Sequence, residues 1–297
     1  DESEPGTFKD REILESNPFQ FLEGLMLASY AVQANRSYVY LRGEFWRLAT
    51  RIEGQIAELE AAGLLGENLF GSDYTLRLHT HLGAGAYICG EETALLESIE
   101  GKLGQPRLRP PFPAVYGLYQ RPTVINNVET LTNVPQIVAH GADWFRGFGT
   151  EKSPGVKIFS LSGCVNRPGN YELPLGTTFR QLIDEYGGGV PEGRQVKAIM
   201  AAGASSNLIL ADEQALDTPM DYESVQDRLG TPLGSASIII LDDSVNVAWL
   251  VNKTVGFFKH ESCGKCTPCR EGTYWMAHIT RRIAAGMATA EDVELLN

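Results

Sequence analysis

A run of three cysteines, spaced C-x2-C-x2-C, constrains this chain more than any other feature of its sequence. Cys263, Cys266 and Cys269 follow one another at intervals of three, so their thiolates can bind one soft metal centre. The common iron–sulfur run C-x2-C-x2-C-x3-C has a fourth cysteine where this chain has Thr273. The spacing therefore predicts an iron–sulfur site that takes its last ligand from elsewhere.

Zinc ligation and unligated thiols are the alternatives for these cysteines. Structural zinc sites use paired spacings, and the sequence has no second pair, because Cys89 and Cys164 each stand alone. We expect neither of them to lie near the helical bundle that carries the three clustered cysteines. His260 is expected to end a helix and not to bind metal.

The composition indicates a folded protein of two or three domains, since 43% of the residues are hydrophobic and 21% are charged. A net charge of -12 argues against a nucleic-acid-binding surface. The cysteine pattern favours a reducing compartment. The polar first residues do not resemble a signal peptide, and no apolar run reaches the ~18–20 residues of a membrane helix. We therefore expect contact with a membrane only through partners.

Hydrophobic periodicity predicts three regions. Residues 1–150 are expected to form an α/β domain with a parallel sheet, because helical and strand patterns alternate there. Its expected elements are helices at 18–35 and 45–62 and strands at 37–42 and 74–79. Residues 155–243 have the order ββαβ…β, which predicts a small mixed sheet wrapped on one helix, as in ubiquitin. Residues 244–297 have a helical pattern, which predicts a bundle with the cysteines at the turn between its first two helices.

A glycine-rich stretch at 83–93 lies between an expected strand and an expected helix, where α/β proteins bind ligands. The dinucleotide fingerprint G-x-G-x-x-G is not met, because Ile88 occupies its third glycine position. Glu91 and Glu92 would repel a phosphate, so they are expected to accept hydrogen bonds from flavin or ribose groups. The alternative is an ordinary tight turn with acidic residues that complement the helix dipole.

Two loops carry further candidates. The proline-rich loop at 106–113 presents Arg109 and Phe112, whose ring could stack on an adenine or could fill a gap in the core. Asn126 and Asn127 precede an expected helix, where capping is the default role and ligand binding the alternative.

Four motifs together resemble the NADH-binding FMN and iron–sulfur flavoprotein subunit of respiratory complex I. They are Gly-Ala-Tyr-Ile-Cys-Gly-Glu-Glu-Thr-Ala at 85–94, Pro-Pro-Phe-Pro-Ala at 110–114, Asn-Asn-Val-Glu-Thr at 126–130 and the cysteine run at 261–272. Diaphorase subunits of NAD-reducing hydrogenases and formate dehydrogenases share this resemblance. It implies an α/β protein with a Rossmann-like FMN domain, a ubiquitin-like (β-grasp) domain and a helical bundle with one [4Fe–4S] cluster.

The resemblance also implies roles for individual residues. Those expected around FMN are Asp1, Glu2, Ser3, Tyr87, Gly90, Glu91, Glu92, Asn126, Asn127 and Thr130. Those expected to face NADH are Glu4, Arg109 and Phe112, and the cluster ligands are Cys263, Cys266 and Cys269. The family usually has Lys where this chain has Arg109. Its glycine-rich phosphate loop and fourth cluster cysteine would lie outside this sequence, which is therefore expected to be an internal fragment.

The implied activity is that of an NADH:quinone oxidoreductase (NADH dehydrogenase) flavoprotein. A hydride passes from NADH to FMN, and single electrons pass to the cluster and onward to quinone through partner subunits. Those partners include a [2Fe–2S] thioredoxin-like subunit of the peripheral arm, on the cytoplasmic side of a bacterial inner membrane or the matrix side in mitochondria. NADH is expected over NADPH, because Glu4 and Glu92 would repel a 2′-phosphate. The rival hypotheses are a hydrogenase or formate dehydrogenase diaphorase and a non-catalytic scaffold.

Overall fold

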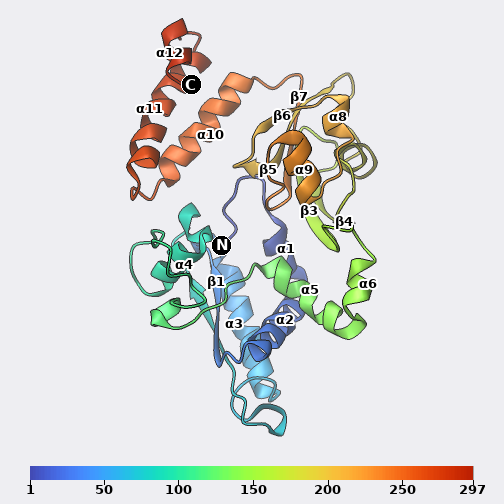
Figure 1. Ribbon diagram of the computed structural model, residues 1–297, viewed down its shortest axis with the longest axis vertical. Coiled ribbons are helices and arrows are strands. Elements are labelled where there is room, and N and C mark those ends of the chain that lie inside the picture. The colour runs from blue at the N-terminus through green and yellow to red at the C-terminus, as the bar shows by residue number, and fades with distance from the viewer. Residues whose placement is uncertain (297) are drawn as a thin grey trace. The chain divides into compact units, whose positions relative to one another are not determined.

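The computed structural model describes residues 1–296, and Figure 1 labels their helices and strands. The chain divides into two compact units. The first unit consists of Asp1–Gly85 and Ile125–Asp243, and the second of Ala86–Val124 and Ser244–Asn297. Each unit thus combines two stretches that are far apart in sequence. The predicted division into three sequential domains stays a prediction.

The first part of unit 1 is a small α/β arrangement with a parallel strand pair. Strands β1 (Arg36–Leu41) and β2 (Arg77–Leu82) pair in parallel from Arg36↔Arg77 to Leu41↔Leu82, as expected for this region. The helices are α1 (Lys9–Ser16), α2 (Pro18–Ala31), α3 (Trp46–Ala61), α5 (Val128–His140) and α6 (Ala142–Arg146), with 3₁₀ turns η1 (Gly43–Phe45) and η2 (Leu69–Gly71).

The α/β core follows from the hydrophobic pattern. In α3, Leu48, Ile52 and Ile56 recur at helical spacing and are buried. Helix α2 packs closely on α5 at Gly24, where a Cβ would come within 1.8 Å of the Leu131 carbonyl oxygen. A side chain at position 24 would therefore push these two helices apart.

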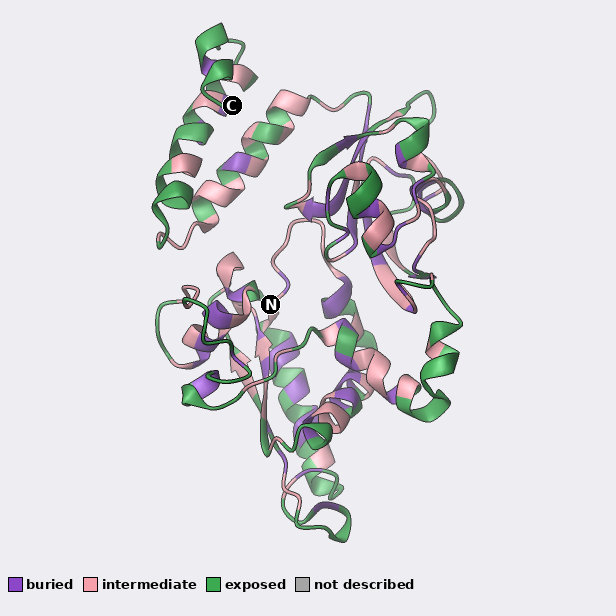
Figure 2. Cartoon of the chain, viewed as in Figure 1, coloured by how far each residue is buried: buried purple, intermediate pink, exposed green. Residues whose placement is uncertain are grey.

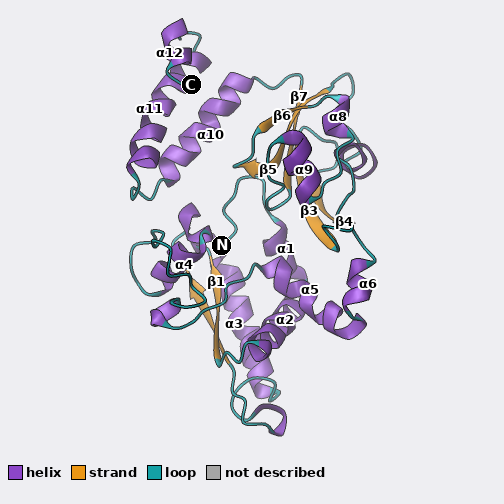
Figure 3. Ribbon diagram, in the orientation of Figure 1, coloured by secondary structure: helices purple, strands orange, loops and turns teal. Residues whose placement is uncertain are grey.

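Unit 1 also contains a five-stranded mixed sheet in the order β4-β3-β7-β5-β6 (Figure 3). Its strands are β3 (Val156–Gly163), β4 (Gly169–Pro174), β5 (Val196–Ala204), β6 (Leu208–Leu210) and β7 (Ser237–Asp242). Only the β3–β7 pair is parallel among these described strands. The predicted mixed sheet is therefore observed, with β6 as an unpredicted edge strand.

One helix supplies the core of this sheet. The one helix expected in this region consists of α7 (Phe179–Gln181) followed by a π-helical turn, η5 (Leu182–Tyr186). Phe179 and Leu182 are fully buried in one cluster with Phe159 of β3 and Ile240 of β7, and the inner strands β5 and β7 are mostly buried (purple in Figure 2). Helices α8 (Glu213–Leu216) and α9 (Tyr222–Leu229) complete this part of the unit.

Unit 2 holds the helical bundle and the glycine-rich turn. The bundle helices are α10 (Val247–Glu261), α11 (Thr267–Ala284) and α12 (Ala290–Glu294), as predicted. The predicted position of the cysteines between the first two helices is correct for Cys263 and Cys266 and wrong for Cys269, because α11 begins at Thr267 and includes it. The other segment contains η3 (Tyr87–Gly90), α4 (Glu92–Ile99) and η4 (Leu118–Gln120). Arg282 of α11 pairs with Asp292 of α12 at 2.8 Å.

One expected boundary is wrong. Strand β2 begins at Arg77 and not at residue 74, because Leu76 instead forms an isolated bridge with Gly66. Helix α1 was not among the expected elements: the Glu2 carboxylate caps it by accepting hydrogen bonds from Asp10 N (2.8 Å) and Arg11 N (3.1 Å). Within residues 1–296, every helix is too short or too polar to cross a bilayer.

Candidate functional site

Glu91 lies where the glycine-rich turn meets α4 and acts as the helix N-cap. Its Oε2 accepts hydrogen bonds from the backbone N–H groups of Thr93 (3.0 Å) and Ala94 (2.9 Å). These amides would otherwise be unsatisfied, and they are the groups that a phosphate would need. The carboxylate thus occupies the place where a phosphate could bind, which agrees with the expectation that no phosphate binds there.

The other oxygen of Glu91 has a different environment. Oε1 is buried and has no hydrogen-bond partner among the described residues, with the Arg109 guanidinium at 3.5 Å. Arg109 instead makes its close contact with Glu92, at 2.6 Å. A buried acceptor without a donor is costly. The site therefore presents an unfilled acceptor beside a cation, which suits a ligand that brings an N–H or O–H group.

Neither the packing around Gly90 nor its backbone conformation requires a glycine at this position. A Cβ at Gly83 would come within 2.1 Å of the Tyr40 hydroxyl, and Gly85 has φ +87°, so both positions need glycine for internal reasons. A Cβ at Gly90 would meet nothing within 4 Å, and its φ lies outside the left-handed region. Open space at this glycine suits the close approach of a flat ligand.

The proline-rich loop is fixed to α4 through Arg107. The guanidinium contacts Glu97 (2.5 Å), Glu100 (2.8 Å) and the Gly117 carbonyl (2.9 Å). Burial alone would raise the pKa of Glu100, but hydrogen bonds from Lys102, Arg107 and Tyr119 N outweigh burial and lower this pKa. Glu100 therefore stays ionised and holds the loop.

Phe112 lies on this loop with 56% of its surface exposed. The alternative that its ring fills a gap in the core is therefore wrong. An exposed ring on a tethered loop is free to stack on a planar ligand.

Tyr87 connects the glycine-rich turn to α10. Its backbone N–H donates to Glu261 Oε2 at 3.1 Å, and its ring meets those of Phe257 (5.3 Å) and Phe258 (6.0 Å) edge to face. No role for Glu261 was predicted from the sequence. Only the fold shows the pairing, because the two residues are far apart along the chain.

The three clustered cysteines lie between and within the helices of the bundle. Cys263 is half-buried in the loop, Cys266 is the N-cap residue of α11, and Cys269 lies in the first turn of that helix. In residues 1–296 no three His, Cys, Asp or Glu side chains are grouped to hold a metal ion, and the Cys269 thiol contacts Ser262 Oγ at 3.4 Å. The donors fit an iron–sulfur cluster in kind, because a helix N-terminus favours thiolates.

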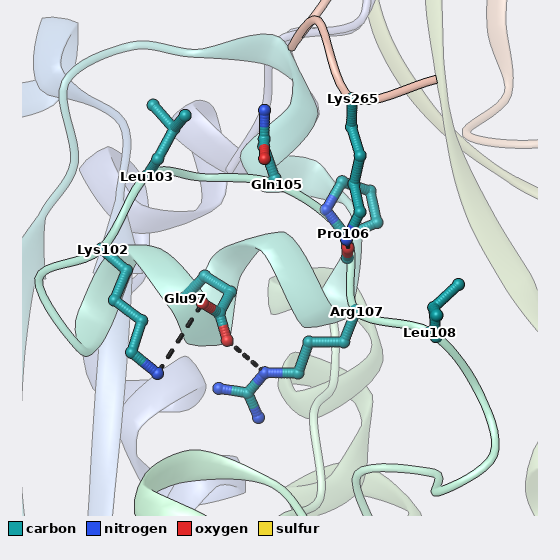
Figure 4. A pocket seen from close by; sticks show the side chains of 8 residues that line it. All are labelled: Glu97, Lys102, Leu103, Gln105, Pro106, Arg107, Leu108 and Lys265. Atoms are coloured by element: carbon teal, nitrogen blue, oxygen red, sulfur yellow. Dashed lines mark hydrogen bonds and ion pairs between the residues drawn. The ribbon is translucent and has the colours of Figure 1, made fainter. Parts of the chain in front are cut away.

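Segments of both parts of unit 2 hold the cysteine loop. Gln105 Nε2 donates to the Cys263 carbonyl at 2.7 Å, and Arg270 donates to the Gly264 carbonyl at 2.6 Å. Lys265 Nζ donates to the Pro106 carbonyl, and Figure 4 shows its side chain reaching toward that residue. These contacts were not predicted from the sequence.

A pocket of about 480 Å³ borders this loop (Figure 4). Lys265 comes from the cysteine loop, and the other lining residues come from the stretch between Glu97 and Leu108. The pocket is distinct from the Glu91, Glu92 and Arg109 group, because none of those three residues lines it.

The two solitary cysteines differ in position. Cys164 follows β3 in unit 1, where its N–H donates to the Ile240 carbonyl at 2.7 Å. Cys89 is buried in unit 2, and a Cβ at Gly104 would come within 2.7 Å of its Sγ. The expectation that Cys89 does not lie near the bundle stays a prediction; both belong to unit 2, where Tyr87 of the same turn contacts α10.

The candidates at the start of the chain lie in unit 1. Glu2 is buried at the start of α1; burial raises its pKa, and the neighbouring Asp10 carboxylate raises it further. Glu4 accepts hydrogen bonds from Ser205 N and Ser205 Oγ, both at 2.8 Å. The Ser3 hydroxyl donates to the Asp1 carboxylate. The carboxylates of Glu2 and Glu4 thus have protein partners.

Asn127 caps α5, as the default hypothesis predicted. Its Oδ1 accepts from Glu129 N (3.0 Å) and Lys9 Nζ (3.0 Å), and its Nδ2 donates to Asp10 Oδ2 (2.7 Å). Asn126 and Thr130 are exposed.

The predicted residues therefore form two sets, one in each unit. Unit 2 contains Tyr87, Gly90, Glu91, Glu92, Arg109, Phe112, Cys263, Cys266 and Cys269, and unit 1 contains Asp1, Glu2, Ser3, Glu4, Asn126, Asn127 and Thr130. Within unit 2, Glu91, Glu92 and Arg109 come together, and Tyr87 joins their turn to α10.

Comparison with known proteins identifies the family. Residues 1–136 match a family described as the Nuo51 FMN-binding domain, residues 158–206 an SLBB domain, and residues 249–297 the NADH-ubiquinone oxidoreductase-F iron-sulfur binding region. The chain is 52% identical to the F 2 subunit of the NADH-quinone oxidoreductase of Rhizobium meliloti, covering 100% of this chain and 70% of that protein. It is 53% identical to the F subunit of the Mycobacterium tuberculosis enzyme, covering 100% of this chain and 66% of that protein.

A solved structure is also similar. An NAD+-reducing [NiFe]-hydrogenase in the H2-reduced state superposes with a TM-score of 0.89 at 39% identity, covering 99% of this chain and 48% of that chain. This chain thus spans about half of the hydrogenase chain and about two thirds of the curated relatives. On these matches, the chain belongs to the family of NADH-quinone oxidoreductase F subunits and contains that family's FMN-binding and [4Fe–4S]-binding regions.

Proposed function

We propose that the chain forms the part of an NADH:quinone oxidoreductase that oxidises NADH and passes the electrons to an iron–sulfur cluster. One observation carries the proposal: the turn with the unfilled Glu91 acceptor and the loop with the three cysteines belong to one compact unit, joined by Tyr87 and Glu261. An enzyme that links hydride chemistry to single-electron chemistry needs these two sites on one support.

Bound FMN would supply the conversion between a two-electron donor and one-electron acceptors. The residues of this chain would bind and orient the reactants. Glu91 Oε1 would accept a hydrogen bond from the flavin or a ribose, and the exposed Phe112 ring would stack on a nucleotide base. Arg109 would orient NADH together with Glu92. Because bound FMN would accept the hydride, the reaction needs no protein nucleophile or acid–base pair.

The cluster would be held by the thiolates of Cys263, Cys266 and Cys269. Two of them lie at the start of α11, whose dipole favours negative charge. The Glu4 carboxylate would contact NADH either after losing its hydrogen bonds from Ser205 or while keeping them and accepting further ones.

Family membership supports a proposal for the partners and the location as well. The protein would work in the peripheral arm of complex I, next to a [2Fe–2S] thioredoxin-like subunit, and would meet the membrane only through partners on its cytoplasmic or matrix side. The mixed sheet would act as a ubiquitin-like module on which partner subunits dock. Its strand order and the SLBB match support this role.

A second candidate is the diaphorase of an NAD+-reducing hydrogenase. The similarity to the hydrogenase chain supports it, at 39% identity over nearly the whole of this chain. Both candidates use the same flavin and cluster chemistry. Isolation of the native complex distinguishes them, because a hydrogenase complex would contain nickel and would reduce NAD+ with H2.

The proposal is tested in the full-length holoenzyme with Cys266→Ser. We expect loss of the low-temperature electron paramagnetic resonance signal of the reduced cluster, whereas NADH bleaches the flavin about as fast as in the wild type, because hydride transfer needs only FMN and NADH. Cys164→Ser is the matched control and should leave both signals unchanged. A metal analysis that finds one zinc ion per chain, or a variant that keeps the cluster signal, would contradict the proposal.

A further inference from the structure

Helix α10 ends with a carboxylate, which its own dipole disfavours. Glu261 is the last residue of the helix, whereas Lys259 and His260 in the same turn have the charge that a helix C-terminus favours. The Glu261 side chain is only 21% exposed, and the His260 ring, with 85% exposure, approaches it no closer than 4.0 Å. Helix physics therefore does not explain why an acidic residue stands here.

The explanation lies in the other segment of unit 2. Glu261 Oε2 accepts the N–H of Tyr87 at 3.1 Å. Tyr87 is the first residue of η3, and the N–H groups at the start of a helical turn point toward acceptors outside the turn. Glu261 thus caps η3 from α10, and the edge-to-face contacts of the Tyr87 ring with Phe257 and Phe258 reinforce the connection.

The same glutamate directly precedes the cysteine loop. Only Ser262 separates it from Cys263, whose carbonyl accepts the hydrogen bond of Gln105 at 2.7 Å. The loop is therefore held on both sides of its first cysteine by the segment that carries Tyr87, Glu91 and Glu92. The turn itself has a further support, because Glu91 caps α4 independently of Glu261.

We propose that Glu261 is a positioning residue that fixes the cysteine loop against the turn beginning at Tyr87. It controls the passage of electrons from flavin to cluster, and it leaves the entry of the hydride largely unaffected. This inference rests on the proposed function. Its physical basis is that a transfer step depends steeply on how the reacting groups are held, whereas NADH and flavin meet without the cysteine loop.

The test compares three variants of the full-length holoenzyme. Glu261→Ala removes the acceptor, and Glu261→Gln removes the charge but keeps an acceptor oxygen. Glu294→Ala is the matched control, because Glu294 ends α12 as Glu261 ends α10 but is exposed. Hydrogen exchange at the Tyr87 amide reports the contact directly and needs no cofactor. Stopped-flow bleaching of the flavin and freeze-quench resonance of the cluster separate the two electron steps.

We expect Glu261→Ala to accelerate exchange at Tyr87 and to slow cluster reduction roughly tenfold, with flavin bleaching within about twofold of the wild type. Glu261→Gln should restore cluster reduction to within about twofold, and Glu294→Ala should match the wild type. Equal slowing of both steps, an unchanged Glu261→Ala variant, or a Glu261→Gln variant as slow as Glu261→Ala would overturn the proposal.

If Glu261→Ala loses the cluster, the test depends on Glu261→Gln. Normal exchange at Tyr87 and normal cluster reduction in that variant support positioning, and a defect in either contradicts it. If NADH fails to bleach the flavin of the wild-type enzyme, the proposed function is wrong, whereas the exchange experiment still decides whether Glu261 holds Tyr87.

Discussion

The two units contain similar groups of carboxylates and cations but differ in how completely these groups are paired. In unit 1, Lys9 contacts Asp10 (2.7 Å) and Glu129 (2.8 Å), and Lys157 contacts Glu129 (3.1 Å). Glu129 Oε1 also accepts the N–H of Ile158 at 2.7 Å. Every charge in this buried group thus has partners of opposite sign or hydrogen-bond donors.

In unit 2, Glu91, Glu92 and Arg109 form a half-exposed group with incomplete pairing. Arg109 is 41% exposed and closes on Glu92, while Glu91 Oε1 keeps only a 3.5 Å approach to the guanidinium. Since the desolvation of an unpaired charge is costly, complete pairing indicates a structural role and incomplete pairing indicates a place for a ligand. The difference separates residues that hold the fold from residues that are available for chemistry.

The largest effect is expected when the complete group is broken. Glu129→Ala removes the carboxylate that Lys157 and the Ile158 N–H contact, and it leaves Lys9 with Asp10 as its one remaining carboxylate partner in this group. We expect a loss of about 3–5 kcal/mol in the free energy of unfolding, measured with urea. Arg180→Ala is the control, because Arg180 makes two ion pairs on the surface of the same unit. A comparable loss in both variants would remove the distinction between the buried group and ordinary ion pairs.

A smaller effect, on binding and not on stability, is expected from Arg109→Ala. Removing the cation leaves Glu91 and Glu92 to repel each other and takes away the group that orients NADH. We expect KM for NADH to rise about tenfold, equivalent to about 1.4 kcal/mol, with an unchanged unfolding midpoint. Arg121→Ala, an exposed arginine of the same segment, should leave KM unchanged. A fall in stability without a change in KM would assign Arg109 to the fold.

The smallest effect concerns acid stability. Burial would raise the pKa of Glu129, but Lys9 and Lys157 outweigh burial and lower it below its ordinary value of 4.5. Its ionised form therefore stabilises the fold above about pH 4.5, and this stabilisation disappears as the pH falls through the lowered pKa. Glu2 has the opposite effect on acid stability. Its pKa is raised by burial, so protonation of its carboxyl group at low pH favours the folded state.

Urea unfolding of Glu129→Gln from about pH 7 down to about pH 3 tests this sign. The variant should lack the part of the acid-induced loss that Glu129 contributes, so its stability should fall less steeply than that of the wild type below about pH 4.5. A wild type and variant with parallel profiles would show that the group does not titrate as described.

The sequence predicts those elements whose cause is local. Helix α3 follows from the spacing of Leu48, Ile52 and Ile56, and the strands of the mixed sheet follow from short apolar runs. Helix α1 was missed because its cap, Glu2, lies several residues before it and works through a carboxylate that no capping motif predicts. Local pattern therefore accounts for most of the architecture and fails where a distant residue completes an element.

The same division applies to the candidate site. Glu91, Glu92 and the cysteines were recognised because their motifs are contiguous. The roles of Glu261, Gln105 and Lys9 were not predicted, because each acts on a partner far away along the chain, Tyr87, Cys263 and Glu129 respectively. Whether Phe112 fills a core could be decided only from its exposure.

The discontinuity of unit 2 has a consequence for biosynthesis. Its first segment, Ala86–Val124, leaves the ribosome before its partner segment, which begins only at Ser244, after the whole mixed sheet. Because nascent chains fold from the N-terminus, the Tyr87 turn must wait for Phe257, Phe258 and Glu261 while the neighbouring unit is already able to fold. Completion of unit 2, which carries the three cysteines, is thereby postponed until α10 has emerged from the ribosome.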